Sequence, residues 1–382
     1  MILVYALLGS TPAEWSDAFN RLLSWNDIRV FIYIFLSLTL AGLMREKGYL
    51  DELVKSTGAL GCKFSVTSVP ALIGLIPMPG GALVSAIALK KRFFEEARLN
   101  PDDATYINYW FRHLWVPSWP LFQSVVITAS VFALDPLQIV SHTWPGTVAA
   151  IAGGLIVSYP VLKALRCPSP NKRGAAAAFA KSIWPLLLLA ALFLFSRLRA
   201  DVVARMPYVG REPLLVSLAL VISLFALATR PGVRDWQGAL RLATKPTIHA
   251  VLLESLIFKD LILAGSAAES VSRLTASGLI PVLAVILIVP FILGLAAGGE
   301  NFFASTAMPL LAPYIASSAM NWKLLTLAYL SGYLGVMASP VHLCLVLTVE
   351  YYRADMGRVL AKVIVTVAVA FLLGALLIEG LY

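Results

Sequence analysis

Charged residues are scarce in this sequence. Only 13% of its 382 residues are Asp, Glu, Lys or Arg, whereas 59% are hydrophobic. Soluble domains carry about 25% charged residues because their surfaces face water. A chain with so few charges cannot form a polar surface over its whole extent, so we expect lipid to surround most of it.

Motifs of several other protein classes are also missing. No phosphate-binding loop of the GxxxxGK[ST] type occurs, which argues against a self-contained ATP-driven pump. The three cysteines, Cys62, Cys167 and Cys344, have no metal-ligand spacing and give no disulfide framework. We interpret them as small apolar residues and predict no cofactor and no structural metal.

Apolar stretches long enough to cross or enter a bilayer recur along the whole chain, and proline or glycine interrupts several of them. We therefore expect an all-α polytopic membrane protein. The stretches lie near residues 28–44, 64–89, 106–134, 146–163, 182–196, 212–229, 246–264, 280–317, 324–350 and 363–380.

The two halves of the chain match each other at a separation of 218 to 221 residues. Gly80-Gly81 falls on Gly298-Gly299, and Pro120 falls on Pro340. Each identity is weak alone, but their order and near-constant offset indicate an internal repeat. On this register Met1–Ser10 corresponds to the second half of the 212–229 stretch, so we expect the first helix to be truncated.

The distribution of basic residues predicts opposite orientations for the two halves. Cytoplasmic loops retain Lys and Arg, and inverted repeats are typical of secondary carriers. The net charge of +9 then follows from loop placement, without a nucleic-acid partner. The loops at 45–62, 90–98, 163–181, 230–245 and 353–362 hold 19 of the 30 Lys and Arg, and the segments at 1–27, 135–145, 197–211, 265–279 and 319–323 hold 7.

These observations predict two inverted repeats, residues 1–201 and 202–382. Each repeat would contain transport elements between two scaffold parts, with one re-entrant hairpin and one broken helix. The boundaries in the first repeat are scaffold 1–58, transport elements 59–134 and scaffold 135–201; in the second they are 202–277, 278–352 and 353–382.

The first hairpin is predicted at Ile76–Ser85, where two prolines and two glycines must break a helix. Irregular backbone at membrane depth is tolerated only where protein buries it or where it lines a wet cavity. The following half-helix would present free N–H groups to an anion. A tight turn between two short buried helices is the alternative. The predicted substrate-binding residues here are Pro79, Gly80, Gly81, Ala82 and Ser85.

The second hairpin is predicted at Ala296–Thr306, where a carboxylate and an amide accompany two glycines. A carboxylate at mid-depth costs about 3 kcal/mol unless it is paired or hydrated. A Glu in water at the mouth of the loop is the alternative. We predict substrate binding by Gly298, Gly299 and Asn301, and coupling to a proton or sodium ion by Glu300, Ser305 and Thr306.

Proline breaks two further helices. Proline frees a carbonyl one turn earlier, and unwound carbonyls coordinate cations or donors. His342 could relay a proton or join two helices by a hydrogen bond. Arg112 could pair with a substrate carboxylate or extend to the cytoplasmic interface. The predicted substrate-binding residues at the breaks are Pro117, Ser118, Ser339 and Pro340.

One apolar span carries three charged residues, Glu254, Lys259 and Asp260. Glu254 and Lys259 are five positions apart, so they point to different faces of a helix. We predict a structural ion pair between this span and another helix.

The chain resembles an uncharacterised bacterial family of membrane proteins with about ten helices, grouped in the ion-transporter superfamily with citrate, dicarboxylate, gluconate, lactate and arsenite permeases. The resemblance covers nearly the whole chain. It rests on Pro77–Ala82, on Phe111–His113 with Trp119-Pro120, and on Ser339–Cys344.

The resemblance implies a homodimer in which each protomer has a scaffold and a transport domain that moves like an elevator. It places hairpin tips at Pro79–Ala82 and Gly298–Asn301, and unwound segments at Pro117–Pro120 and Ser339–His342. The dicarboxylate carriers have Ser-Asn-Thr-type tips, which this chain lacks. Sodium coupling and dicarboxylate recognition therefore do not follow from the resemblance.

The leading hypothesis is a secondary transporter in a bacterial inner membrane. It would carry a small anionic or polar metabolite and be driven by a proton or sodium gradient. A membrane-embedded enzyme using Glu300, His342 and Glu350 is the alternative, although no HExxH or GxSxG motif supports it. A channel is the third possibility.

Overall fold

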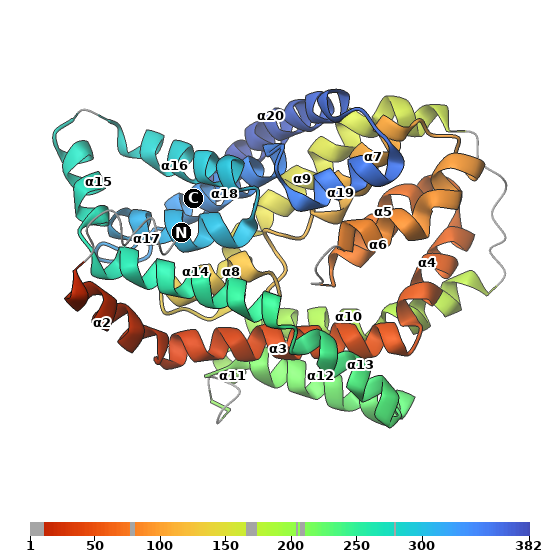
Figure 1. Cartoon of the computed structure of the whole chain (residues 1–382), viewed down its shortest axis with the longest axis horizontal. Helices are drawn as coiled ribbons and strands as arrows, with labels where there is room; N and C mark the ends of the chain where they lie inside the picture. Colours follow the sequence, from red (N-terminus) through yellow and green to blue (C-terminus); the bar gives the residue numbers. More distant parts are fainter. Residues whose placement is uncertain (1–10, 77–80, 166–173, 204, 207–210, 279) are drawn as a thin grey trace.

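The computed structural model describes residues 11–76, 81–165, 174–203, 205–206, 211–278 and 280–382 (Figure 1). All regular structure in these residues is helical, which confirms the predicted all-α membrane fold. Within the described part of the chain, five helical segments are long and apolar enough to cross a membrane. They are Trp25–Glu46, Pro136–Ala164, Ala175–Leu198, Trp322–Tyr352 and Met356–Leu381.

The helices repeat along the chain with the spacing that the sequence predicts. Eight helices of the first half each have a counterpart that begins 218 to 221 residues later. The pairs are α2 (Pro12–Leu22) with α13 (Val233–Ala243), α3 (Trp25–Glu46) with α14 (Pro246–Ala264), α4 (Tyr49–Leu60) with α15 (Ala267–Ala276), α5 (Cys62–Gly74) with α16 (Val282–Ala297), α6 (Gly81–Lys91) with α17 (Glu300–Ile315), α7 (Pro101–Arg112) with α18 (Trp322–Ala338), α8 (Gln123–Val131) with α19 (Leu343–Tyr352), and α9 (Pro136–Ala164) with α20 (Met356–Leu381).

The remaining described elements join the halves or extend a hairpin. They are the π-helix η1 (Arg92–Glu96), α10 (Ala175–Leu198), α11 (Ala200–Val203) and α12 (Pro213–Thr229).

Contacts between α9 and its counterpart α20 show that the two halves are inverted. A Cβ atom added at Gly153 would lie 3.3 Å from the Cβ of Ala370, and one added at Gly374 would lie 3.3 Å from the Cβ of Ala149. Residue numbers therefore rise along α9 where they fall along α20, so the two helices are antiparallel. Equivalent helices run in opposite directions, as the basic loops predict.

Each hairpin packs against the broken helix of the other half, as this symmetry requires. In Figure 1, α5 and α6 lie towards the right-hand end and α16 and α17 towards the left-hand end. The second helix of each hairpin packs against the broken helix of the other half: α6 against α19, and α17 against α8. Both hairpins are thereby held next to the breaks.

The two predicted helix breaks are present. The first separates α7 from α8 between residues 113 and 122, and the second separates α18 from α19 between residues 339 and 342. Pro117, Pro120 and Pro340 lie within these breaks, where a missing N–H and the proline ring prevent a continuous helix.

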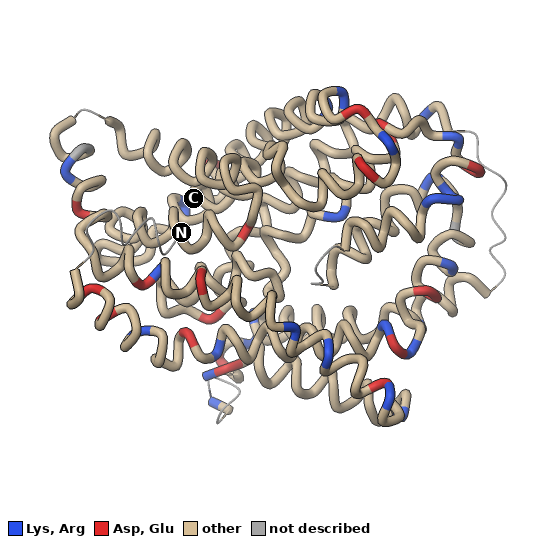
Figure 2. The backbone as a smooth tube through the Cα atoms, viewed as in Figure 1, with Lys and Arg blue, Asp and Glu red and all other residues tan. Residues whose placement is uncertain are grey.

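The outer surface is apolar along the helices and charged at their ends. Leu194, Leu227 and Leu376 are 59%, 74% and 70% exposed, as expected for side chains that contact lipid. Figure 2 shows many Lys and Arg at the right-hand end of the view, near α4, η1 and the start of α13, whereas α2 and α15 lie at the left-hand end. The basic loops therefore share one end of the molecule.

We expect cysteines introduced at Lys91 and Ser318 to be labelled from opposite sides of the membrane. Both residues are exposed, and each lies at the end of a hairpin, in different halves. A membrane-impermeant maleimide should modify Lys91→Cys only from the cytoplasmic face and Ser318→Cys only from the other face, in right-side-out and inside-out vesicles. Labelling of both from one face would contradict the inverted arrangement.

Candidate functional site

A cavity of about 450 Å³ lies where the second hairpin meets both helix breaks. Its polar wall contains the α16–α17 turn and side chains from the end of α7 and the start of α19. Ile34, Leu38 and Val251 of α3 and α14 form part of the apolar wall. The residues with polar groups on it include Arg112, His113, Gly298, Gly299, Glu300, Asn301, His342 and Cys344.

Two glycines form the turn of the second hairpin. Gly298 has a φ of +61°, in the left-handed region that favours glycine. A Cβ atom there would lie 2.8 Å from the backbone nitrogen of His342 and 2.9 Å from Oγ of Ser339. Gly299 is the N-cap residue of α17, and it has no side chain that could accept a hydrogen bond from the first turn of the helix. The first N–H groups of α17 therefore have no side-chain acceptor from the N-cap and lie at the cavity.

Glu300 and Asn301 connect this turn to neighbouring helices. Oγ of Ser124 on α8 donates to Oε2 of Glu300 at 3.0 Å, and the Tyr329 hydroxyl donates to Ser124 at 2.8 Å. Nδ2 of Asn301 donates to Oγ of Ser255 on α14 at 2.9 Å. One carboxylate oxygen thus has a fixed orientation in the cavity wall.

Arg112 is the positive group of the cavity. It ends α7 and is only 4% exposed, so it does not extend to the membrane interface. A Cβ atom at Gly81 would overlap its guanidinium, so glycine at the start of α6 permits this approach. Nε of Arg112 has no hydrogen-bond partner, and in the described chain no carboxylate lies within ion-pair distance of it. Its charge is available to a solute.

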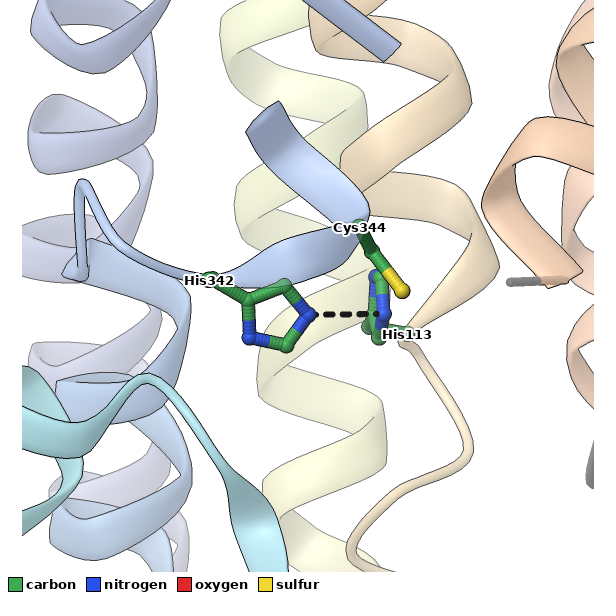
Figure 3. A group of neighbouring side chains, drawn as sticks. All are labelled: His113, His342 and Cys344. Carbon is green, nitrogen blue, oxygen red and sulfur yellow. Dashed lines mark hydrogen bonds between the residues drawn. The ribbon is translucent and has the colours of Figure 1, made fainter. Parts of the chain in front are cut away.

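Two histidines and a cysteine lie together on the same wall (Figure 3). Nε2 of His342 lies 3.3 Å from Nε2 of His113, and the ligand atoms of these residues and Cys344 are all within 4.8 Å of one another. His113 and His342 are 229 positions apart, so sequence spacing gave no signal of this cluster. The interpretation of every cysteine as a small apolar residue is also wrong for Cys62, which is disulfide-bonded.

Residues of the first hairpin mainly bond to α7. Ser85 donates to Oδ1 of Asn108 at 2.7 Å, and Nδ2 of Asn108 donates to the carbonyl oxygen of Ala82 at 2.9 Å. Ala82 and Ser85 are fully buried. Two predicted residues of this hairpin, Pro79 and Gly80, lie outside the described residues.

The predicted residues of the first break face α9 instead of the cavity. Thr143 donates to the carbonyl oxygen of Pro117, and Thr147 donates to that of Leu114 at 2.9 Å. The Ser118 and Thr147 hydroxyls are 2.7 Å apart. The freed carbonyls of Pro117 and Leu114 therefore have protein donors.

At the second break, Ser339 is buried and donates to the carbonyl oxygen of Leu295 at 2.6 Å, whereas Pro340 is exposed. Ser305 and Thr306 are buried in α17, and both hydroxyls donate to the carbonyl oxygen of Phe302. These hydroxyls stabilise local backbone.

Glu350 lies near the end of α19 with its side chain exposed, and it does not line the cavity. Glu350 is thus not brought together with Glu300 and His342 in this cavity.

A buried ionic network joins the two halves through α3, α8 and α14. Nζ of Lys259 on α14 lies 2.5 Å from Oδ1 of Asp27 on α3 and 3.0 Å from Oδ1 of Asp260. Ser130 of α8 donates to Asp27 and accepts from Lys259 at 2.9 Å. All three charged side chains are at most 3% exposed. The predicted ion pair between this span and another helix is confirmed.

We expect Lys259→Ala to destabilise the protein by about 3–5 kcal/mol, because it leaves two buried carboxylates without a counter-charge. Lys323→Ala is the matched control, since Lys323 pairs with Glu379, whose side chain is 59% exposed; its loss should cost about 0–1 kcal/mol. Equilibrium unfolding in detergent micelles measures both. Equal effects of the two substitutions would contradict a stabilising role for the network.

Comparison with known proteins supports the fold. The model of a family described as a protein of unknown function, DUF401, matches residues 17–380. The crystal structure of the YdaH transporter from Alcanivorax borkumensis, described as having an unusual topology, superposes with a TM-score of 0.54 over 94% of this chain and 90% of that chain. The two sequences are 14% identical, so the likeness concerns the fold. No curated protein matches the chain.

Proposed function

We propose that this chain, which belongs to the DUF401 family of proteins of unknown function, is a secondary transporter of a small anionic or polar metabolite. The proposal places it in a bacterial inner membrane and couples transport to a proton or sodium gradient. The structural likeness to a transporter supports a transport role, and the contents of the cavity support the class of solute.

The buried, unpaired Arg112 carries the argument for an anion. A guanidinium at membrane depth without a carboxylate partner is costly, and such groups mark solute pathways. Uncapped N–H groups at the start of α17 face the same cavity. A helix N-terminus also favours negative charge. A carboxylate or similar anion between Arg112 and the Gly298–Gly299 turn would satisfy both sets of donors.

Glu300 supports coupling to a cation. Its carboxylate and the Arg112 guanidinium line one cavity, so their formal charges cancel when no solute is bound. A bound monoanion would leave one uncompensated negative charge in a low-dielectric region. A proton on Glu300, or a sodium ion beside it, would restore neutrality, so solute and cation would bind together.

The walls of the cavity fit movement of one part past another. Hairpin and broken-helix residues form its polar side, whereas Ile34, Leu38 and Val251 contribute apolar side chains from α3 and α14. We propose an elevator-like shift of the elements within 59–134 and 278–352 against a scaffold, in a homodimer. This shift would break the hydrogen bonds of Asn301 with Ser255 and of Ser130 with Asp27 and Lys259, which join the two parts.

Arg112→Gln should abolish binding and transport of organic anions, because it removes the positive charge and keeps similar volume. Thermal-shift screening of the purified protein against organic acids identifies the solute, and counterflow in proteoliposomes measures its transport. Arg358→Gln is the matched control, since the Arg358 side chain is 76% exposed. Wild-type counterflow in Arg112→Gln would overturn the assignment of the anion site.

Glu300→Gln should separate exchange from accumulation. The amide keeps the hydrogen bond with Ser124 but cannot gain or lose a proton, so counterflow should persist while gradient-driven accumulation falls at least about tenfold. Glu379→Gln, at an exposed position, should behave as wild type. Undiminished accumulation by Glu300→Gln under both proton and sodium gradients would exclude Glu300 as the coupling residue.

A further inference from the structure

We propose that His113, His342 and Cys344 form a binding site for a zinc-class divalent ion, with one coordination position open to the cavity. The three residues come from the two helix breaks: His113 follows α7, and His342 and Cys344 begin α19. Figure 3 shows the His342 ring pointing at His113, with the Cys344 sulfur beside the His113 ring. An ion there would connect the first half of the chain to the second.

The spacing of the nitrogens fits a shared ion. Two nitrogens bound at about 2.0–2.1 Å to a tetrahedral ion stand roughly 3.3–3.4 Å apart. The Nε2 atoms of His113 and His342 are 3.3 Å apart. This exceeds the usual length of hydrogen bonds with nitrogen donors, about 2.7–3.2 Å.

The backbone fixes His113 in the form that binds metal. Its Nδ1 atom lies 2.7 Å from the carbonyl oxygen of Tyr109, and a carbonyl oxygen only accepts hydrogen bonds. Nδ1 therefore carries the proton, and Nε2 of the neutral ring presents its lone pair to His342. Metal-bound histidines are commonly oriented by such a bond to a carbonyl.

The ligand set selects the class of ion. Imidazole nitrogen and cysteine sulfur together suit zinc and similar borderline-soft ions, whereas magnesium and calcium prefer oxygen. Cys344 is a free cysteine and loses its thiol proton when a metal binds. A divalent ion and one thiolate together carry a charge of +1, in the same cavity as the Arg112 guanidinium and the Glu300 carboxylate.

The open position follows from the placement of the three residues. All three line the cavity, and three protein ligands leave a fourth position for water or a solute oxygen. That a solute anion takes this position rests on the proposed function. The ion site itself does not depend on the proposed function. The internal repeat does not produce a second copy of this site, because the positions equivalent to His342 and Cys344 at an offset of 220 are Phe122 and Ser124.

Metal binding by the intact protein tests the site. Chelator-stripped protein in detergent is titrated with Zn²⁺ against a chromophoric chelator, and with Co²⁺ by absorbance. We expect one ion per chain, with a thiolate-to-cobalt charge-transfer band in the near ultraviolet. Cys344→Ser should remove that band and weaken Zn²⁺ binding about 100-fold, and His113→Asn should weaken it similarly. His142→Ala, outside the cavity, should leave both unchanged.

Several outcomes would overturn the proposal. These are wild-type protein that binds no Zn²⁺, Co²⁺ bound without a thiolate band, and Zn²⁺ affinity unchanged in both variants. The cobalt spectrum of the wild-type protein tests for thiolate ligation even if a variant does not fold. Uptake of radiolabelled zinc by proteoliposomes then distinguishes a permanently bound ion from a transported one. One retained ion per chain indicates a resident ion, and continued accumulation indicates that zinc is cargo; both results support the site. Wild-type protein that binds no Zn²⁺ but shows anion counterflow would reject the ion site and leave the proposed function in place.

Discussion

Backbone N–H and C=O groups inside a bilayer must find partners, and this requirement organises the structure. Each helix break releases carbonyls that lipid cannot satisfy. In the first break, Thr143 and Thr147 of α9 donate to two of them. In the second, the Tyr109 hydroxyl donates to the carbonyl oxygen of Met337 at 3.0 Å. The surrounding helices thus supply hydrogen-bond donors to both breaks, and Arg112, His113 and His342 beside them line one cavity.

The two halves use the same architecture for different purposes. Hydroxyl groups of α9 donate hydrogen bonds to the free carbonyl groups of the first break. Arg112 and His113, at the start of this break, supply charged and titratable side chains to the cavity. The second half supplies the turn at Gly298–Gly299 and the proposed ligands His342 and Cys344. Inverted symmetry therefore accounts for the scaffold, whereas the site depends on departures from symmetry, because equivalent positions carry unlike side chains.

The sequence predicted the fold further than the site. Length, scarcity of charge and the offset of about 220 residues determine helix positions and inversion, since these depend on local composition and on the bilayer. The Gly-Gly-Glu-Asn turn also identified cavity residues, because a carboxylate beside glycines is unusual in an apolar span. Sequence could not show that the Ser118 hydroxyl bonds to α9, or that His113 meets His342. Those contacts depend on side-chain directions across helices distant in the chain.

The central claim is that a cavity bounded by both helix breaks opens alternately to the two sides of the membrane. Leu343 lines this cavity and is 61% exposed. The most direct measurement is the labelling rate of Leu343→Cys, in a Cys344→Ser background, by an impermeant maleimide added to right-side-out or inside-out vesicles. The account predicts labelling from both faces, slowed by the transported anion. Labelling from one face only, whatever solute or gradient is present, would contradict it.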